Sequence, residues 1–370
     1  MADPLLNVAG VIIETATLQE VAPGVHWLRM PLPFQLDHIN LWVLEDGDGW
    51  TIVDTGINRD EVRTAWQTLF DGPLKGRPVK RVIVTHFHPD HMGLAGWLCE
   101  KFAVRMWTTE TEWATASKLY DDNGEQHAAR ARDFYHAAGF DAAQMAEVDK
   151  RQNPYPKRIS SVPESFIKIA DGAVVDIDGH DWRVIVGTGH SPEHACLYRI
   201  HDHVLISGDQ ILPKITPNVS VWPQFPEMNP LKAFLESLDK FRGLDPETLV
   251  LPSHNWPFKG LHKRLDQLAH HHDERLDDVV QDVLGALAHP PRRTLDHLAV
   301  ELQLLHVLLK LEFQLGARGL AATSGAKPER QRVTLAAGRR VLDRDDRLPR
   351  DDVDVLVAPV LPDLAADLRH

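Results

Sequence analysis

Apolar residues recur along the first two thirds of the chain in short runs, and polar loops separate the runs. Residues 38–57 contain two β-rich runs joined by the turn EDGDG, which is typical of a β-hairpin. Residues 79–102 begin with a short apolar run, continue through a histidine-rich loop and end in a helical pattern. Further strand patterns follow at 172–178, 181–190, 203–212 and 248–258. This succession of strands and helices indicates an α/β fold.

A helical segment, residues 107–165, interrupts this succession. Thr109 is followed three residues later by Glu112, which predicts a capping box for a helix that runs through Tyr120. A second helical pattern covers residues 125–138 and stops at a glycine, and the stretch after it is Pro-rich and irregular. We expect a helical insertion that overhangs a pocket.

The pattern changes beyond residue 260. Apolar residues repeat at helical spacing between residues 265 and 287, and residues 298–315 form a second, more apolar helical pattern. The last stretch mixes strand-like fragments with runs of charge, which is typical of loosely ordered chain. We therefore expect a main domain over residues 1–260 and a mainly helical C-terminal extension over residues 261–370.

Charge and cysteine content narrow the class of protein. The net charge of −13 disfavours loose binding to nucleic acid or to an anionic membrane. No run approaches the roughly eighteen apolar residues of a membrane helix, and the start of the chain lacks the basic region of a signal peptide. The two cysteines, Cys99 and Cys196, lie in apolar segments and favour a reducing compartment. These features predict a cytoplasmic protein that contacts no membrane.

Candidate metal ligands follow the ends of the predicted strands. Four of them lie in the loop THFHPDH: His86, His88, Asp90 and His91. Histidine nitrogens and carboxylate oxygens bind zinc, iron and manganese, and a tight loop of this kind can direct side chains to two neighbouring ions. The loop completes neither site alone. Three further candidates follow later strand patterns: His190, Asp209 and His254.

These motifs resemble those of the metallo-β-lactamase superfamily. THFHPDHMG is similar to the His-x-His-x-Asp-His signature of that family, and VDTG, GTGHSPEH, SGDQ and LPSH resemble its other motifs in the same order. The resemblance covers roughly residues 20–260. It implies a four-layer αββα sandwich, in which two β-sheets pack face to face between outer layers of helices, as the catalytic domain.

The resemblance also implies two metal sites. One ion is assigned three histidines: His86, His88 and His190. The other is assigned Asp90, His91 and His254. Asp209 would bridge the two ions. Ligands of this kind without cysteine suit two divalent ions, and zinc is expected before iron or manganese.

Further roles follow from the same resemblance. A water shared by two divalent ions loses a proton near neutral pH, and Asp90 is expected to orient the hydroxide that attacks the substrate. Asp54 corresponds to the aspartate that braces the ligand loop and fixes the orientation of a histidine. His194, four residues after His190, resembles the second histidine of a GHSxGH motif and is a second candidate catalytic residue, although Glu193 stands at the usual glycine.

Residues 212–230 form a long loop with several prolines, directly after the predicted bridging aspartate. Long loops of this kind are more often functional than idle. Trp222 and Phe225 of this loop, and Tyr120 of the insertion, are therefore candidates for the substrate pocket.

The complete ligand set is similar to that of glyoxalase II, acyl-homoserine lactonases and the β-lactamase-like endoribonucleases, whereas β-lactamase branches replace the aspartate at position 209. We expect hydrolysis of a small ester, thioester or lactone at a dinuclear centre. Three alternatives remain: a phosphodiesterase or endoribonuclease, a sulfur dioxygenase with one iron, and a metal-binding scaffold without catalysis. The partner is expected to be a small molecule. The apolar residues 298–315 are also compatible with a homodimer.

Overall fold

Two β-sheets of seven strands each form the centre of the protein in a computed structural model, which describes residues 6–7, 13–122 and 124–288. The chain divides into two units, residues 1–268 and residues 269–370, and both sheets lie in the first unit. The predicted helical residues 298–315 and the tail after them lie outside the described residues.

The first sheet combines antiparallel and parallel strands. Its order is β2 (Leu18–Ala22), β3 (Val25–Pro31), β4 (His38–Asp46), β5 (Gly49–Val53), β6 (Val79–Ile83), β7 (Met106–Thr108) and β8 (Phe166–Lys168). Pairs from β2 to β5 are antiparallel, and pairs from β5 to β8 are parallel. The hairpin expected over residues 38–57 is β4 and β5, with Asp46 paired to Gly49 across the turn.

The second sheet contains the later strands. Its order is β1 (Leu6–Asn7), β14 (Phe258–Lys259), β13 (Leu249–Pro252), β12 (Val204–Gly208), β11 (His194–Arg199), β10 (His180–Gly187) and β9 (Val174–Ile177). Only β12 and β13 are parallel among these described pairs. β11 is not among the predicted strands, because all six of its residues are buried and its pattern does not alternate.

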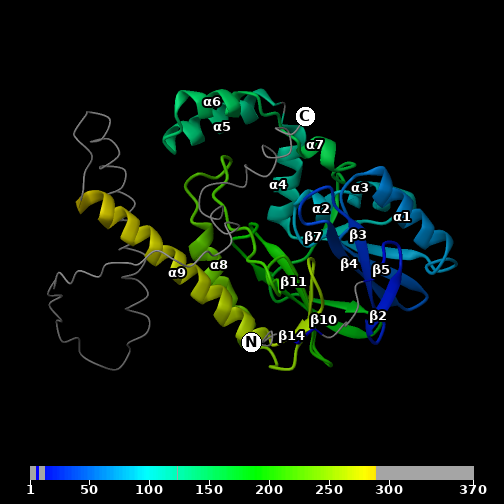
Figure 1. Ribbon diagram of the computed structural model, residues 1–370. Coiled ribbons are helices and arrows are strands. Elements are labelled where there is room, and N and C mark those ends of the chain that lie inside the picture. The colour runs from blue at the N-terminus through cyan, green and yellow to red at the C-terminus, as the bar shows by residue number, and fades with distance from the viewer. Residues whose placement is uncertain (1–5, 8–12, 123, 289–370) are drawn as a thin grey trace. The chain divides into compact units, whose positions relative to one another are not determined.

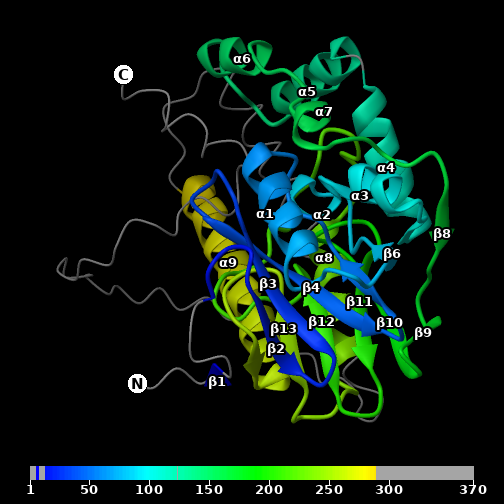
Figure 2. The ribbon, with the colours of Figure 1, turned by 90° about the vertical axis from the view of Figure 1, so that its right-hand side faces the viewer.

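Helices lie outside the sheets and in the insertion. Three follow β5 and β6: α1 (Asp60–Asp71), α2 (Pro89–Met92) and α3 (Ala95–Phe102). Four form the insertion: α4 (Glu110–Asp121), α5 (Glu125–Ala137), α6 (Ala142–Asp149) and α7 (Tyr155–Arg158). The remaining helices among the described residues are α8 (Pro230–Leu238), the 3-10 helix η1 (Asp239–Phe241) and α9 (Leu261–Ala288). Both ribbon views show α5 and α6 apart from the sheets (Figures 1 and 2).

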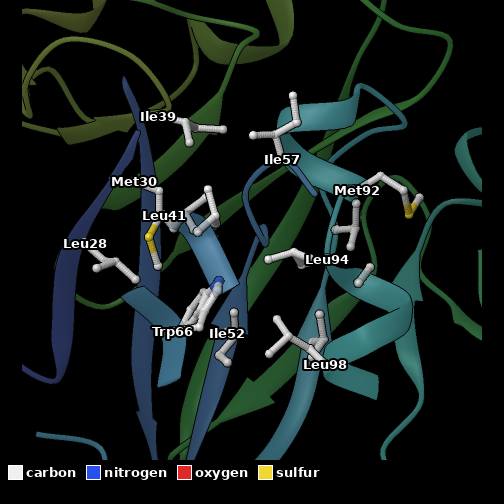
Figure 3. Close-up of a cluster of buried hydrophobic side chains, with 14 of the residues drawn as sticks. Leu28, Met30, Ile39, Leu41, Ile52, Ile57, Trp66, Met92, Leu94 and Leu98 are labelled. Atoms are coloured by element: carbon white, nitrogen blue, oxygen red, sulfur yellow. The ribbon is translucent and has the colours of Figure 1, made fainter. Parts of the chain in front are cut away.

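Alternate residues of β4 face different layers. Leu41 and Val43 join a cluster on the outer side of the first sheet, and Figure 3 shows Leu41 in this cluster with Trp66 of α1 and Leu98 of α3. Trp42 and Leu44 face the second sheet and join a different cluster. Since successive side chains of a strand point to opposite faces, β4 has helices on one side and a sheet on the other.

The second sheet shows the same alternation. Val184 and Val186 of β10 face the first sheet, whereas Ile185 between them faces outward. Ile185 shares its cluster with Phe234 of α8 and Leu265 of α9, so these helices cover the outer side. The order of layers is therefore helix, sheet, sheet, helix, and the predicted αββα sandwich is confirmed.

The insertion differs from its prediction in three ways. Residues 106–108 form β7, so the helices of the insertion begin at Glu110. The prediction of a capping box for α4 is wrong, because the Thr109 side chain caps no backbone N–H of the helix. The Thr109 hydroxyl instead donates to the Glu193 carbonyl, and the Glu112 carboxylate accepts hydrogen bonds from other loops. The stretch expected to be irregular contains α6, whose N-terminus is capped by Asp141.

The first turns of α9 complete the first unit. Leu261, Leu265 and Leu268 are fully buried against the second sheet. Arg264 on the same helix donates hydrogen bonds to the carbonyls of Leu212 and Ile215, which ties the helix to the loop after β12. Within the residues that the structure describes, no helix is both long and apolar enough to cross a membrane.

Candidate metal centre

The predicted ligands lie at one edge of the sandwich. The loops that carry them follow the carboxyl ends of β6, β10, β12 and β13. The pairs β5 with β6 and β12 with β13 are parallel, so the residues after these strands emerge on the same side. The carboxyl edge of a sheet is the usual place for chemistry in α/β folds. At this edge the Asn40 amide donates to the Ser253 carbonyl (2.6 Å), which joins the two sheets.

The structure brings the seven predicted ligands together in two groups. One contains His86, His88, His190 and Asp209, and the other contains Asp90, His91, Asp209 and His254. Within each group, one nitrogen or carboxylate oxygen from every residue lies within 4.8 Å of the others. The groups have the same membership as the two sets expected from the sequence, and Asp209 belongs to both.

The histidine loop is fixed by close packing of its own backbone. Pro89 occupies the first turn of α2, which is short and ends before Gly93. A Cβ atom at Gly93 would lie only 2.4 Å from the carbonyl oxygens of Gly56 and Pro89. Only glycine therefore allows the HPDHMG segment to pack against the DTG turn after β5.

Asp54 braces this loop from the first sheet. Its Oδ1 accepts the amide of Thr85 (2.8 Å), and its Oδ2 lies 2.8 Å from Nδ1 of His91. Asp54 has a φ of +61°, a conformation that costs a non-glycine residue strain. Because Nδ1 of His91 donates its proton to Asp54, the lone pair of the neutral ring lies on Nε2, which faces Asp90 and Asp209.

Two other histidines are held in the same way. Nδ1 of His190 donates to the carbonyl of Asn218 (2.8 Å), and Nδ1 of His254 donates to the carbonyl of His38 (2.9 Å). In each ring the opposite nitrogen, Nε2, faces Asp209 at 3.4 Å and 3.3 Å respectively. The backbone carbonyls thus orient both rings, and in the neutral form of each ring the lone pair on Nε2 points toward the carboxylate.

The charges of the second group suit a cation. Burial alone would lower the pKa of His91, but the carboxylates of Asp54, Asp90 and Asp209 together raise it well above its usual value. Nε2 of His91 and Oδ1 of Asp209 are buried without a hydrogen-bond partner among the described residues. Buried polar atoms of this kind are normally satisfied. A divalent ion would satisfy both atoms and supply the positive charge that the carboxylates favour.

His86 and His88 are neutral in this environment. Burial lowers the pKa of both rings well below the usual value, and the neighbouring histidines lower it further. Nε2 of His86 lies 2.9 Å from Nδ1 of His88 and 3.2 Å from Nε2 of His190. A neutral imidazole is the form that binds a metal, so the rings of His86 and His88 are prepared as ligands.

His194 lies behind Asp209 and is fully buried. Its Nε2 accepts the amide of Asp209 (3.0 Å), and its Nδ1 lies 3.5 Å from Sγ of Cys196. A Cβ atom at Gly208 would lie 2.3 Å from the His194 ring, so the glycine of SGDQ permits this contact. Both ring nitrogens of His194 are engaged by the protein, which favours a positioning role over the catalytic role expected from the sequence.

The candidate pocket residues lie in different surroundings. The Trp222 ring is 6.0 Å from the His88 ring, so this side chain borders the first group. Phe225 lies 5.3 Å from the Lys118 ammonium, which connects the loop after β12 to α4. Tyr120 packs against the hydrophobic cluster outside the first sheet. The contacts therefore favour Trp222 as a substrate neighbour and do not bring Tyr120 to the ligands.

Two residues of the insertion reach the ligand loops without having been predicted there. Glu112 accepts hydrogen bonds from the backbone of Phe87 and from Ser191, and Tyr155 donates to the Phe87 carbonyl. The sequence placed Glu112 in a capping box. A carboxylate on the buried face of a helix is the signal that would have marked it.

Comparisons with known proteins agree with this geometry. A family model described as the Metallo-beta-lactamase superfamily matches residues 35–254. The crystal structure of a beta-lactamase domain protein from Burkholderia ambifaria is 44% identical with a TM-score of 0.65, and the match covers 74% of this chain and 82% of that one.

Two further proteins are similar over most of their length. A metallo-beta-lactamase family protein from Thermus thermophilus is 28% identical with a TM-score of 0.62, over 71% of this chain and 84% of that one. The probable metallo-hydrolase YqjP of Bacillus subtilis is 24% identical over 258 residues, which are 68% of this chain and 78% of that protein.

Proposed function

The chain belongs to the metallo-beta-lactamase superfamily and is an enzyme of the metallo-hydrolase type, and we propose that it hydrolyses a small ester, thioester or lactone at a centre of two divalent ions. One observation supports the two-ion centre more strongly than any other observation. The two ligand groups share Asp209, whose oxygens lie 3.4 Å from His190 and 3.3 Å from His254. A carboxylate between two groups is suited to bridge two ions.

The donor atoms limit which ions fit. Imidazole nitrogens and carboxylate oxygens, without a thiolate, suit zinc, iron and manganese, and we propose zinc. When bound, two such ions lower the pKa of a shared water and stabilise the negative charge that develops on the attacked group.

Asp90 is the residue that we assign to the attacking water. Its side chain is 19% exposed, more than that of Asp209 at 9%, so it is the more accessible of these two carboxylates. Its Oδ2 lies 3.6 Å from His254 and 3.7 Å from His91. From this position Oδ2 can accept a hydrogen bond from a water and direct the oxygen lone pair toward the substrate.

The loop after β12 supports an apolar substrate. Trp222 borders His88, and Val221 and Met228 of the same loop are exposed at 38% and 53%. An aromatic side chain beside a polar centre, on a loop that exposes further apolar side chains, is typical of a site that binds an apolar group. The acyl or alkyl part of the substrate would lie against this loop. We propose a small molecule as the partner, since the chain carries a net charge of −13 that disfavours nucleic acid.

Metal analysis and one variant test the two-ion centre. Protein purified without added metal and then equilibrated with zinc should bind two ions per chain. Asp209→Ala should lose both ions and nearly all activity, because each group loses a ligand. A variant that keeps two ions and full activity would contradict the bridging role. One tightly bound iron in the wild-type chain would instead favour the sulfur dioxygenase.

A substrate panel separates the remaining functions. Zinc-loaded enzyme should hydrolyse p-nitrophenyl acyl esters, acyl thioesters or lactones, with kcat/KM rising with acyl chain length. Faster turnover of bis-p-nitrophenyl phosphate would favour the phosphodiesterase. No turnover of any of these by a chain that holds two ions would favour the metal-binding scaffold.

A further inference from the structure

Both backbone polar groups of Phe87 are bound by side chains of the insertion. Phe87 stands between His86 and His88, so its peptide groups connect two of the candidate ligands. Its N–H donates to Oε2 of Glu112 (2.9 Å), and its carbonyl accepts the Tyr155 hydroxyl (2.5 Å). These two hydrogen bonds fix the rotation of the segment that directs both histidine rings.

The other oxygen of Glu112 binds a second ligand loop. Oε1 accepts the Ser191 hydroxyl (2.7 Å) and the amide of Glu193 (2.6 Å). Ser191 directly follows His190, the third histidine of the same ligand group. One carboxylate therefore connects the two loops that carry all three histidines of this group.

The connection is completed by Glu193, which stands where the family motif has a glycine. Its Oε2 accepts the amide of Thr111 in the first turn of α4, and its carbonyl accepts the Thr109 hydroxyl. The start of α4 therefore donates hydrogen bonds to the loop after β10 and also accepts one from the Glu193 amide. This arrangement explains a departure from the motif that the sequence left without a role.

The burial of Glu112 shows that the contact is specific. The side chain is fully buried, and burial raises its pKa to about 7 although three donors, Phe87 N–H, Ser191 O–H and Glu193 N–H, stabilise the charged form. Removing a carboxylate from water is costly unless hydrogen bonds replace the solvent. A helix that only covered the fold would be more stable with an apolar side chain at this position.

We propose that Glu112 and Tyr155 are positioning residues, through which the insertion sets the metal affinity of the group formed by His86, His88, His190 and Asp209. The proposal rests on the metal binding proposed above. Neither residue needs to touch an ion or the substrate. Each acts through the backbone of a ligand loop, in the way that groups around a metal site orient its ligands.

Two variants remove these contacts with little change in shape. Glu112→Gln leaves an NH₂ group facing a backbone N–H in either orientation of the amide, so one buried donor loses its acceptor. Tyr155→Phe removes a single hydroxyl and leaves the Phe87 carbonyl without that donor. The matched control is Trp113→Phe, since Trp113 also lies on α4 and donates a hydrogen bond to Pro163 but binds no ligand loop.

The experiment measures metal binding apart from activity. Metal-free wild type and the three variants are titrated with zinc against a chromophoric chelator, and the cobalt(II) forms are compared by their visible absorption. Thermal unfolding of the metal-free proteins reports general loss of stability. We expect about 10- to 100-fold weaker binding of one ion in Glu112→Gln and Tyr155→Phe, with an altered cobalt spectrum, and unchanged values in Trp113→Phe.

Two other outcomes would overturn the proposal. Variants that bind zinc as tightly as Trp113→Phe, with the wild-type cobalt spectrum, would show that the insertion only covers the fold. If Glu112→Gln yields no folded protein, Tyr155→Phe decides by the same criterion. A wild-type chain that binds no ion would overturn the proposed function and this proposal together, whereas equal binding by wild type and variants overturns this proposal alone.

Discussion

The Asp54 carboxylate lies 2.8 Å from Nδ1 of His91 and fixes which nitrogen of that ring carries the proton. In Asp54→Asn the side-chain oxygen can still accept the Thr85 amide, but the NH₂ group then faces Nδ1 of His91 and favours the opposite tautomer. Nε2 would be protonated and unable to bind metal.

We expect this variant to bind the second ion about 10- to 100-fold more weakly. Zinc stoichiometry at limiting free zinc should fall from two toward one. Asp46→Asn is the control, because Asp46 is buried in β4 with Thr51 and Arg81 as partners and lies outside both ligand groups. Two ions bound with equal affinity by all three proteins would show that Asp54 does not set the tautomer.

His194→Phe separates positioning from proton transfer. The ring volume is kept, but the buried amide of Asp209 loses its acceptor, at a cost of about 1–3 kcal/mol in the free energy of unfolding. We expect weaker metal binding and a lower kcat with an unchanged shape of the pH–rate profile. Loss of one limb of that profile would instead assign a proton-transfer role to His194. Cys196→Ala leaves the Asp209 contact intact and should retain metal affinity.

Glu112 should make the stability of the metal-free protein fall as pH rises. Its pKa is raised from 4.5 to about 7 by burial, so the folded state binds this proton more tightly than the unfolded state does. The stabilisation is complete below about pH 4.5 and is lost as pH rises through about 7, with a total on the order of 3 kcal/mol.

Urea unfolding between pH 5 and pH 8 tests this dependence. Glu112→Gln has no proton to lose at this position, so its free energy of unfolding should change less with pH than that of the wild type. Glu100→Gln, at an exposed position of α3, should follow the wild type. Parallel curves for all three proteins would contradict the raised pKa.

Trp222→Ala should weaken the binding of long acyl substrates. The indole borders His88. For substrates that reach it, the buried apolar area contributes on the order of 1–2 kcal/mol to the binding free energy, which corresponds to about a five- to thirtyfold change in KM. Acetyl esters should be affected less than octanoyl esters, and zinc stoichiometry should stay at two. Equal changes for short and long chains would place the acyl group elsewhere. Val174→Ala, at an exposed residue of β9, is the control.

The grouping of the candidate ligands at one edge was predictable, because the loops that carry them follow strands with a recognisable pattern. His86, Asp209 and His254 come directly after short apolar runs, and the carboxyl ends of these strands meet at one edge. The β4–β5 hairpin was likewise predictable from its two β-rich runs and the turn between them. Local sequence carries this information because the period of a strand and the end of an apolar run are local properties.

Contacts between distant segments were not predictable in this way. Glu112 has the spacing of a capping box, and only the approach of the loops after β6 and β10 turns its carboxylate away from the helix end. The segment of β11 is buried on both faces and shows no alternation. His194 resembles a catalytic histidine by position, whereas its role depends on the Asp209 amide, which lies on another strand end.

The hydrogen bond from His254 to the carbonyl of His38 has a consequence for the order of folding. It joins the last ligand loop to the first strand of the β4–β5 hairpin, so the second ligand group is complete only after the two sheets have docked. An ion can then bind only to chain that is already folded, and it cannot nucleate the fold. We therefore expect zinc to slow the unfolding of the protein strongly. The refolding rate should be nearly the same with zinc as without it.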